Sequence, residues 1–224
     1  MAGGAGDSDR WEADKSDAVA AQAIVLDLTL SGLQSTYLGT GTVRGIETLT
    51  LKTGAGVDVI TTLAANQGDV VDAGAGNDRV KVAGGFDTVD MGTGSDTLIV
   101  DYSGTDAPIG SEYAGDTFGF SGSLGAGYKG AYAYKFNAND GVAPRVMFTG
   151  VEKFELTLGG GDDAIATGDG DDYFRGNGGA DFFNGAGGVD TADFSDKTAA
   201  VVVTLNGAVD AAVNVGGTVE DTLR

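Results

Sequence analysis

Apolar and polar residues repeat along this chain with a period of nine. An apolar side chain recurs two residues after an aspartate at nine positions, which are Ile60, Val71, Val80, Val89, Leu98, Ile165, Phe174, Phe183 and Ala192. A turn residue, a polar residue and a core residue in constant phase are typical of a repeat fold. We therefore predict an all-β protein in which each repeat forms one turn and one short inward-facing strand.

The aspartates of these repeats fall into two groups. The first group is Asp58, Asp69, Asp78, Asp87 and Asp96, and the second is Asp163, Asp172, Asp181 and Asp190. Except at Gln67, a glycine precedes each aspartate by two residues: Gly56, Gly76, Gly85, Gly94, Gly161, Gly170, Gly179 and Gly188. Further turn glycines are Gly54, Gly74, Gly92, Gly159 and Gly168. Two repeats make one full coil, so repeats i and i+2 are expected to stack on the same edge.

Each turn combines the two kinds of oxygen that calcium binds. A Gly-x-Gly turn can adopt positive φ and expose main-chain carbonyls, and the aspartate adds a carboxylate. Calcium takes roughly 6–8 such oxygens at about 2.3–2.6 Å. We predict an ion between Asp78 and Asp96, or between Asp163 and Asp181, with the turn glycines as carbonyl ligands. Full occupancy of the same-edge pairs gives about four to six ions.

These repeats resemble the nonapeptide G-G-x-G-x-D-x-U-x of RTX (repeats-in-toxin) proteins. The best matches are residues 93–98, 168–174 and 185–190. The resemblance implies two parallel β-roll blocks with calcium in the turns. It also implies a fragment of a larger protein that is secreted, by a type I system, or displayed on the cell surface, as in an adhesin or a surface layer. The repeats depart from the motif at Ala65 and Gln67, and Ala83, Asn177 and Ala186 replace the second glycine.

A second level of repetition divides the chain. Residues 45–51 align with residues 150–156 at an offset of 105. We expect a flexible N-terminal segment (1–18), capping and leading strands (19–52), and a first roll block (53–103). A β-hairpin insertion rich in aromatic residues and glycine (104–147), a second leading strand and roll block (148–195), and C-terminal strands (196–224) that continue into a further module should follow.

Composition fits a fold that depends on a cation. The chain has 33 acidic and 13 basic residues, a formal charge of −20 and a pI near 4.1. Such a chain repels itself on compaction and is a poor partner for nucleic acid. Its 40 glycines raise the entropy lost on folding. We therefore expect calcium, at extracellular levels of roughly 10⁻⁴–10⁻³ M, to drive folding.

Several functional classes are disfavoured by what the sequence lacks. It has no cysteine and no histidine, which excludes thiolate metal sites and catalytic groups built on those residues. No apolar run of about 18 residues occurs, so we expect no membrane span. The carboxylate pairs Asp162-Asp163 and Asp171-Asp172 fall inside the turn repeat, where ion binding accounts for them. We expect no enzymatic activity.

Two alternative functions stay open. The insertion carries Tyr113, Phe118, Phe120, Tyr128, Tyr132, Tyr134 and Phe136. These rings could present a face that binds a glycan or another cell-surface component, or they could form a hydrophobic cover packed on the roll. The chain could also be a non-catalytic targeting module of a secreted enzyme. The sequence sets no oligomeric state.

Overall fold

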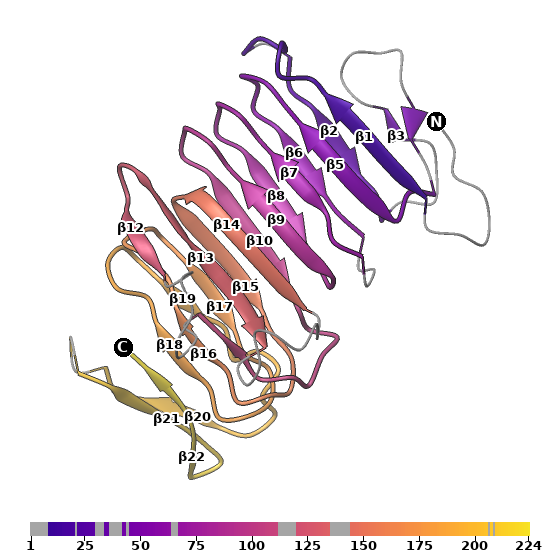
Figure 1. Ribbon diagram of the computed structural model, residues 1–224. Coiled ribbons are helices and arrows are strands. Elements are labelled where there is room, and N and C mark those ends of the chain that lie inside the picture. Colours follow the sequence, from indigo (N-terminus) through magenta and orange to yellow (C-terminus); the bar gives the residue numbers. More distant parts are fainter. Residues whose placement is uncertain are drawn as a thin grey trace.

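A computed structural model describes residues 9–20, 22–29, 34–35, 42–43, 45–63, 67–111, 120–134, 144–205, 207 and 209–224. The chain is all-β and consists mainly of parallel strands (Figure 1). No helix occurs among these residues, and so none of them forms a helix long and apolar enough to cross a membrane. The predicted fold class, an all-β parallel solenoid, is confirmed.

The strands stack into two long sheets. The first, here called the parallel sheet, contains in spatial order β19 (Thr191–Ala192), β17 (Tyr173–Arg175), β15 (Lys153–Thr157), β10 (Thr97–Asp101), β8 (Arg79–Val82), β6 (Val59–Thr61) and β2 (Val25–Asp27). Every neighbouring pair in it is parallel. Successive strands of this sheet are one full coil apart, as the prediction of two repeats per coil requires.

The second sheet, here called the mixed sheet, lies across the core from the first. Its order is β1 (Arg10–Asp14), β5 (Thr48–Lys52), β7 (Val70–Asp72), β9 (Phe86–Asp90), β14 (Arg145–Val151), β13 (Gly127–Tyr134), β11 (Ile109–Gly110), β16 (Ala164–Ala166), β18 (Phe182–Asn184), β22 (Thr218–Leu223), β21 (Ala211–Val215) and β20 (Val201–Val203). Strand β12 (Ser121–Ser123) pairs with β13, and β3 (Gln34–Ser35) pairs with β4 (Thr42–Val43).

The core is built from the apolar residues of the repeat. Eight of the nine predicted core residues are at most 3% exposed, and the ninth, Ala192, is half-buried in the last short strand of the parallel sheet. Each has half-buried or exposed neighbours on both sides along the chain, as strand alternation requires. The predicted periodic core is therefore confirmed.

The two predicted roll blocks form one continuous stack. In the parallel sheet β10 of the first block pairs directly with β15 of the second, with Leu98 opposite Phe154. The two copies of the 105-residue repeat lie on opposite sheets, because β5 is in the mixed sheet and its counterpart β15 is in the parallel sheet. The insertion therefore interrupts only the mixed sheet, where β13 runs antiparallel between β14 and β11.

The aromatic residues of the insertion that the structure describes belong to the core. Tyr132 is fully buried and packs on Phe148 at 5.0 Å and on Phe154 at 5.7 Å between ring centroids. Phe120 stacks on Tyr128 at 5.2 Å. These rings form the hydrophobic cover rather than an exposed face. Tyr113, Phe118, Phe136 and the side chain of Tyr134 lie outside the described residues.

The two ends differ from the expected boundaries. Residues 10–14, expected in a flexible segment, form β1, which pairs in parallel with β5 and turns Trp11 and Ala13 toward the core. Exposed and half-buried residues alternate along β1. This alternation predicts a strand, but the charged residues in and around β1 made the pattern hard to recognise in the sequence. The expected C-terminal strand is present as β20, but it runs antiparallel to β21. Strand β22 extends the roll by pairing in parallel with β18.

Candidate metal-binding edges

The aspartates of the parallel sheet form a ladder along one edge, at the start of each strand. The Asp58 N–H donates to Oδ1 of Asp78 at 2.8 Å, and the Asp78 N–H donates to Oδ1 of Asp96 at 2.7 Å. The Asp172 N–H donates in the same way to Asp190 at 3.0 Å. Each carboxylate thus satisfies a main-chain donor one coil away, and the predicted stacking of repeats i and i+2 is confirmed.

A second ladder follows the corresponding edge of the mixed sheet. The Asp69 N–H donates to Oδ1 of Asp87 at 2.9 Å, and the Asp163 N–H donates to Oδ1 of Asp181 at 3.0 Å. Eight of the nine predicted aspartates are at most 3% exposed, and only Asp190, in the last described coil of the parallel sheet, is exposed. The two edges therefore bury carboxylates at a regular one-coil spacing.

Sequence reasoning missed Glu152, which takes an aspartate's place in the ladder. Its Oε2 accepts the Asp96 N–H at 2.9 Å, and the Phe154 N–H next to it donates to Asp172 at 2.8 Å. The residue has the phase of the repeat, with Gly150 two positions before it and Phe154 two positions after it. Accepting glutamate at the aspartate position would have found it.

Two further acidic residues extend the ladders in the same way. Glu47 accepts the Asp9 N–H at 2.8 Å and stands two residues before the buried Leu49. Asp221 accepts the Asp181 N–H at 2.8 Å and stands two residues before Leu223, which packs against the core. The ladders therefore reach beyond the predicted repeats at both ends of the mixed sheet.

The second carboxylate oxygen of several ladder aspartates is buried without a partner. Oδ1 accepts the main-chain hydrogen bond, whereas Oδ2 has no hydrogen-bond partner in Asp58, Asp78, Asp87, Asp96 and Asp172. A buried carboxylate is unfavourable unless it is paired with a cation, coordinated to a metal or protonated. The ladder thus leaves negative charge that the described side chains at these positions do not neutralise.

Burial raises the pKa of four of these carboxyl groups, those of Asp78, Asp87, Asp96 and Asp172. It raises the pKa of Asp78 to about 7, with hydrogen bonding at Asp58 opposing the shift and the charges of Asp58 and Asp96 adding to it. It also raises the pKa of Asp87 and of Asp181 to about 8. A nearby cation favours the ionised form instead. At neutral pH these carboxyl groups are therefore stable in the folded protein only if a proton or a cation neutralises them.

Two of the predicted glycines, Gly76 and Gly94, stand close to both a main-chain carbonyl oxygen and a carboxylate oxygen. A Cβ on Gly76 would stand 1.8 Å from the carbonyl oxygen of Gly56 and 2.9 Å from Oδ1 of Asp78. A Cβ on Gly94 would stand 1.5 Å from the carbonyl oxygen of Gly76 and 3.0 Å from Oδ1 of Asp96. With φ of 154° and 156°, both residues also have a backbone conformation that favours glycine. Glycine therefore lets the turns stack closely enough to gather both oxygen types.

The other predicted glycines fall into groups according to what their carbonyl oxygens contact. Those of Gly54, Gly74 and Gly159 accept main-chain hydrogen bonds from the next same-edge turn, and that of Gly85 accepts the Arg145 N–H. Two further carbonyls repeat the close approach seen at Gly56 and Gly76: the oxygens of Gly161 and Gly170 lie 2.3 and 2.2 Å from where a Cβ on Gly179 and on Gly188 would stand. At Gly168 the space is filled by the ring of Tyr128, and Gly92 packs on the carbonyl of Gly74.

Carboxylates alone do not form a metal site here. Among the described residues, no three acidic side chains come close enough together to hold an ion. The carboxylates are spaced along the edges and the carbonyls lie between them. A cation would therefore take most of its ligands from main-chain carbonyls and one or two from carboxylates, a mixture that suits calcium.

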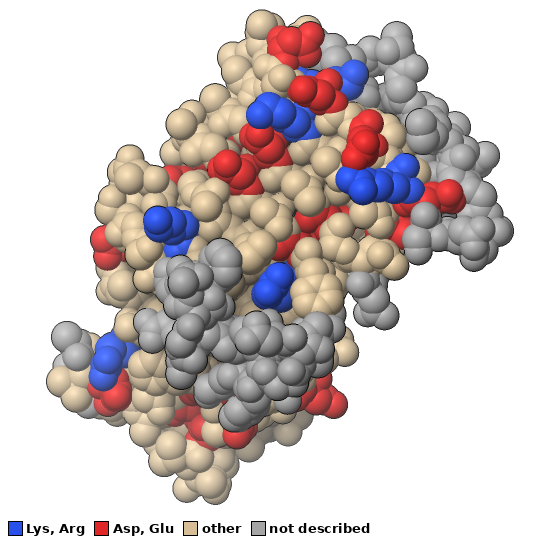
Figure 2. Space-filling model, in the orientation of Figure 1, with Lys and Arg blue, Asp and Glu red and all other residues tan. Residues whose placement is uncertain are grey.

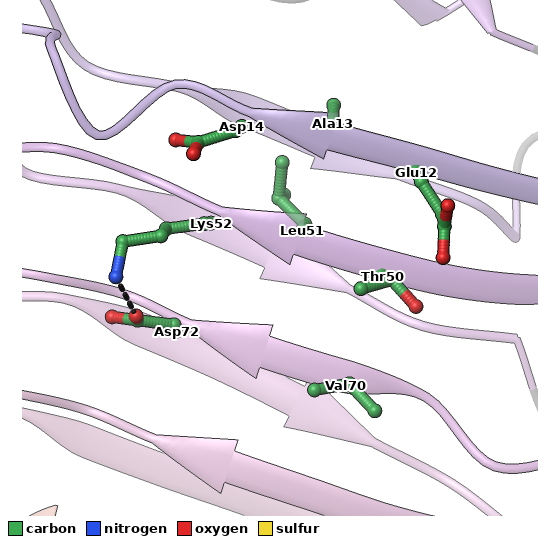
Figure 3. A pocket seen from close by; sticks show the side chains of 8 residues that line it. All are labelled: Glu12, Ala13, Asp14, Thr50, Leu51, Lys52, Val70 and Asp72. Atoms are coloured by element: carbon green, nitrogen blue, oxygen red, sulfur yellow. Dashed lines mark hydrogen bonds and ion pairs between the residues drawn. The ribbon is translucent and has the colours of Figure 1, made fainter.

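The outer surface offers a weaker candidate. A shallow hollow of about 380 Å³ over β1, β5 and β7 is lined by Glu12, Asp14, Lys52 and Asp72, among others (Figure 3). Lys52 already pairs with Asp72 at 2.5 Å. On the visible face of the molecule, acidic side chains are interspersed with Lys and Arg rather than gathered in one patch (Figure 2). The buried edges are therefore the better candidate site.

No protein family and no curated protein matches this chain. The two carboxylate ladders are therefore the observation that bears on function.

Proposed function

We propose that this chain is a calcium-binding β-roll module whose folding is driven by extracellular calcium. It would serve as a structural or adhesive part of a large secreted or cell-surface protein. The observation that carries the proposal is the set of buried, unpartnered carboxylate oxygens on Asp58, Asp78, Asp87, Asp96 and Asp172. Each lies in a turn of the type that presents carbonyl oxygens.

The residues fit calcium by chemistry and by placement. The ligands are hard oxygens only, since the chain has no cysteine or histidine, and calcium prefers such ligands. Bound dications would also offset a formal charge of −20. Because the turns come together only in the folded roll, binding free energy would appear as folding free energy.

The experiment is a calcium titration of chelator-treated protein followed by far-UV circular dichroism, with magnesium as the control. A cooperative transition from coil to β-structure near roughly millimolar calcium supports the proposal. Magnesium should fail, because it needs near-octahedral geometry and gives up its water reluctantly. A complete β-spectrum in chelator that calcium leaves unchanged, with no calcium retained on dialysis, would refute it.

The glycan-binding alternative is weakened by the position of the insertion rings that the structure describes. Tyr128 and Tyr132 are 6% and 0% exposed and pack against the core, whereas stacking on a sugar needs an accessible ring face. We therefore place the function of the described residues in the turns. The other alternative, a targeting module of a secreted enzyme, involves the same calcium-bound roll. It differs from the proposed function only in the protein to which the roll belongs.

A further inference from the structure

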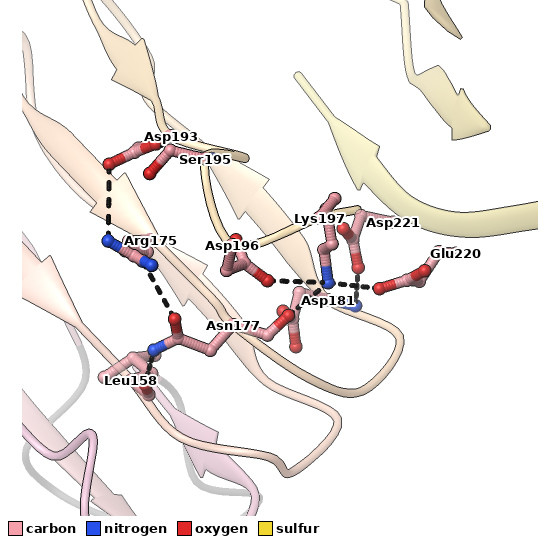
Figure 4. A network of polar contacts seen from close by, with 10 residues as sticks. All are labelled: Leu158, Arg175, Asn177, Asp181, Asp193, Ser195, Asp196, Lys197, Glu220 and Asp221. Carbon is pink, nitrogen blue, oxygen red and sulfur yellow. Dashed lines mark hydrogen bonds and ion pairs between the residues drawn. The ribbon is translucent and has the colours of Figure 1, made fainter. Parts of the chain in front are cut away.

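The last described step of the mixed-sheet ladder contains a cation that the chain itself supplies. This step joins Asp181, in the turn before β18, to Asp221 in β22 through the Asp181 N–H. Lys197, from the loop after β19, extends its side chain between these two segments (Figure 4). Three segments that are far apart in the sequence thus meet around one ammonium group.

The polar partners of the ammonium are oxygen atoms of the kinds that bind calcium. Nζ of Lys197 donates to the main-chain carbonyl of Asn177 and to the carboxylate of Glu220. It also lies 3.4 Å from Oδ2 of Asp196. Asn177 holds the position of the second glycine in its repeat and keeps the positive φ of that position, 66°. The carbonyl it presents is therefore a turn carbonyl of the repeat.

Burial distinguishes this lysine from the other paired cations. The Lys197 side chain is 9% exposed, compared with 50% for Lys52, 45% for Arg79 and 36% for Lys81 in their ion pairs. Lysine is rarely buried unless it is paired. Although burial lowers the pKa of Lys197, the hydrogen bond to Glu220 and the nearby acidic charges outweigh it and leave the pKa raised. The group is therefore a permanent positive charge.

We propose that the Lys197 ammonium is the resident cation of the step between Asp181 and Asp221, and that this step takes no calcium ion. The ammonium provides the positive charge that the other steps require from solution, at the cost of fixing one long side chain. A dication placed beside it would meet repulsion from the ammonium and find the Asn177 carbonyl already engaged. The inference rests on the proposed function only for what the other steps bind.

The test compares Lys197→Met with the wild type. Methionine keeps the length of the side chain and removes its charge. Equilibrium dialysis followed by elemental analysis should find one more calcium ion per chain in the variant. At the lowest calcium that folds the wild type, amide exchange at residues 211–223 should be at least about tenfold faster in the variant, because a charge-assisted hydrogen bond is lost. Higher calcium should restore protection.

A matched control is Lys52→Met, which removes a lysine paired with Asp72 on the exposed side of the same sheet. It should change neither the ion count nor exchange at residues 211–223. An unchanged ion count together with unchanged exchange in the Lys197→Met variant would overturn the inference. If that variant does not fold, Glu220→Gln replaces it: the ammonium stays, so exchange should rise with no added ion, and an added ion or unchanged exchange would count against the inference.

The outcome also separates this inference from the proposed function. If the folded wild type binds no calcium, the proposed function fails. Faster exchange at residues 211–223 in the Lys197→Met protein would then still assign the charge-neutralising role to Lys197. Unchanged exchange under those conditions would overturn both.

Discussion

The middle and the end of the roll handle the same buried charge in different ways. At the middle step, Asp78 and Asp96 are joined by a main-chain hydrogen bond, and the Oδ2 atom of each has no partner. At the end step, Asp181 and Asp221 are joined by the same bond, but the charge of the nearby Lys197 acts on both carboxylates. Burial is still the largest effect on Asp181, yet the charge of Lys197 acts to lower the pKa of that group.

The difference separates two roles of the ladder, the stacking of the coils and the neutralisation of buried charge. The main-chain hydrogen bonds set the spacing of the coils and recur at both steps, so they do not depend on how charge is neutralised. Under the proposed function, neutralisation is local: the chain supplies it at the end step, and calcium from solution supplies it at the middle step. We therefore propose that the roll stacks by backbone geometry and is stabilised by cations.

The largest expected effect on stability comes from adding a side chain in the narrow space between coils in the middle of the roll. Gly94→Ala would place a Cβ 1.5 Å from the carbonyl oxygen of Gly76, at a φ of 156°. Backbone strain and overpacking together should destabilise the protein by about 3 kcal/mol or more. Urea unfolding in saturating calcium measures the loss.

The end region supplies the comparison for that variant. Gly217 has a φ of 89° but nothing within 4 Å of its Cβ position, so Gly217→Ala should cost only about 1 kcal/mol from its backbone conformation. Gly104→Ala, with open space and no positive φ, should be close to neutral. Equal losses of stability in the Gly94 and Gly217 variants would show that close stacking of the turns is not the reason why glycine is required at position 94.

The next effect is a pH dependence that calcium reverses. Burial raises the pKa of Asp78 to about 7 and of Asp87 to about 8, against about 3.9 in an unfolded chain. The folded state then holds protons that the unfolded state has lost, so the calcium-free protein loses stability as pH rises from about 4 to about 8. We expect acidification from about pH 8 to about pH 5 to stabilise it.

Urea unfolding in chelator at the two pH values measures this gain. Saturating calcium should invert the sign, because its ligands must be deprotonated and protons compete for them. A calcium-free protein that becomes less stable on acidification would contradict the account of the unpartnered carboxylates.

Removing one carboxylate charge at each of the two steps should give different results. Asp78→Asn keeps an oxygen to accept the Asp58 N–H and removes an unneutralised charge, so the calcium-free protein should be stabilised. The calcium concentration at half-maximal folding should rise about tenfold, since site affinity follows ligand charge. Asp221→Asn removes a charge that burial disfavours but Lys197 favours, so it should change the stability of the calcium-free protein less than Asp78→Asn does and leave the calcium midpoint nearly unchanged. Circular dichroism titrations of both variants decide this, and equal midpoint shifts would erase the difference between the steps.

Much of the fold could be predicted because it is periodic and local. Val80 and Leu98 were placed in the core by phase alone, and both are fully buried. The stacking of Asp78 on Asp96 followed from two repeats per coil. These features depend on residues within one or two coils, where spacing along the chain determines spacing in the fold.

What could not be predicted depends on long-range packing. The nine-residue period does not show that the insertion interrupts only the mixed sheet. It also does not show that the two copies of the 105-residue repeat lie on opposite sheets. Glu152 carries a readable signal, but its role became visible only when the Asp96 N–H was found to donate to it. Lys197 has no motif at all, because its place is set by three segments meeting around it.

The smallest effect tests how strictly the end of the roll follows the turn geometry of the middle. Ala186 and Asn177 replace glycine at the second turn position and have φ of 61° and 66°. Ala186→Gly should stabilise the protein by about 1 kcal/mol, because alanine is strained in this conformation. Asn177→Gly should not stabilise it, since the Asn177 side chain donates to the Leu158 carbonyl and accepts from Arg175. Thermal unfolding in saturating calcium measures both, and a gain at Asn177 equal to that at Ala186 would mean that its side-chain hydrogen bonds contribute nothing to holding the turn.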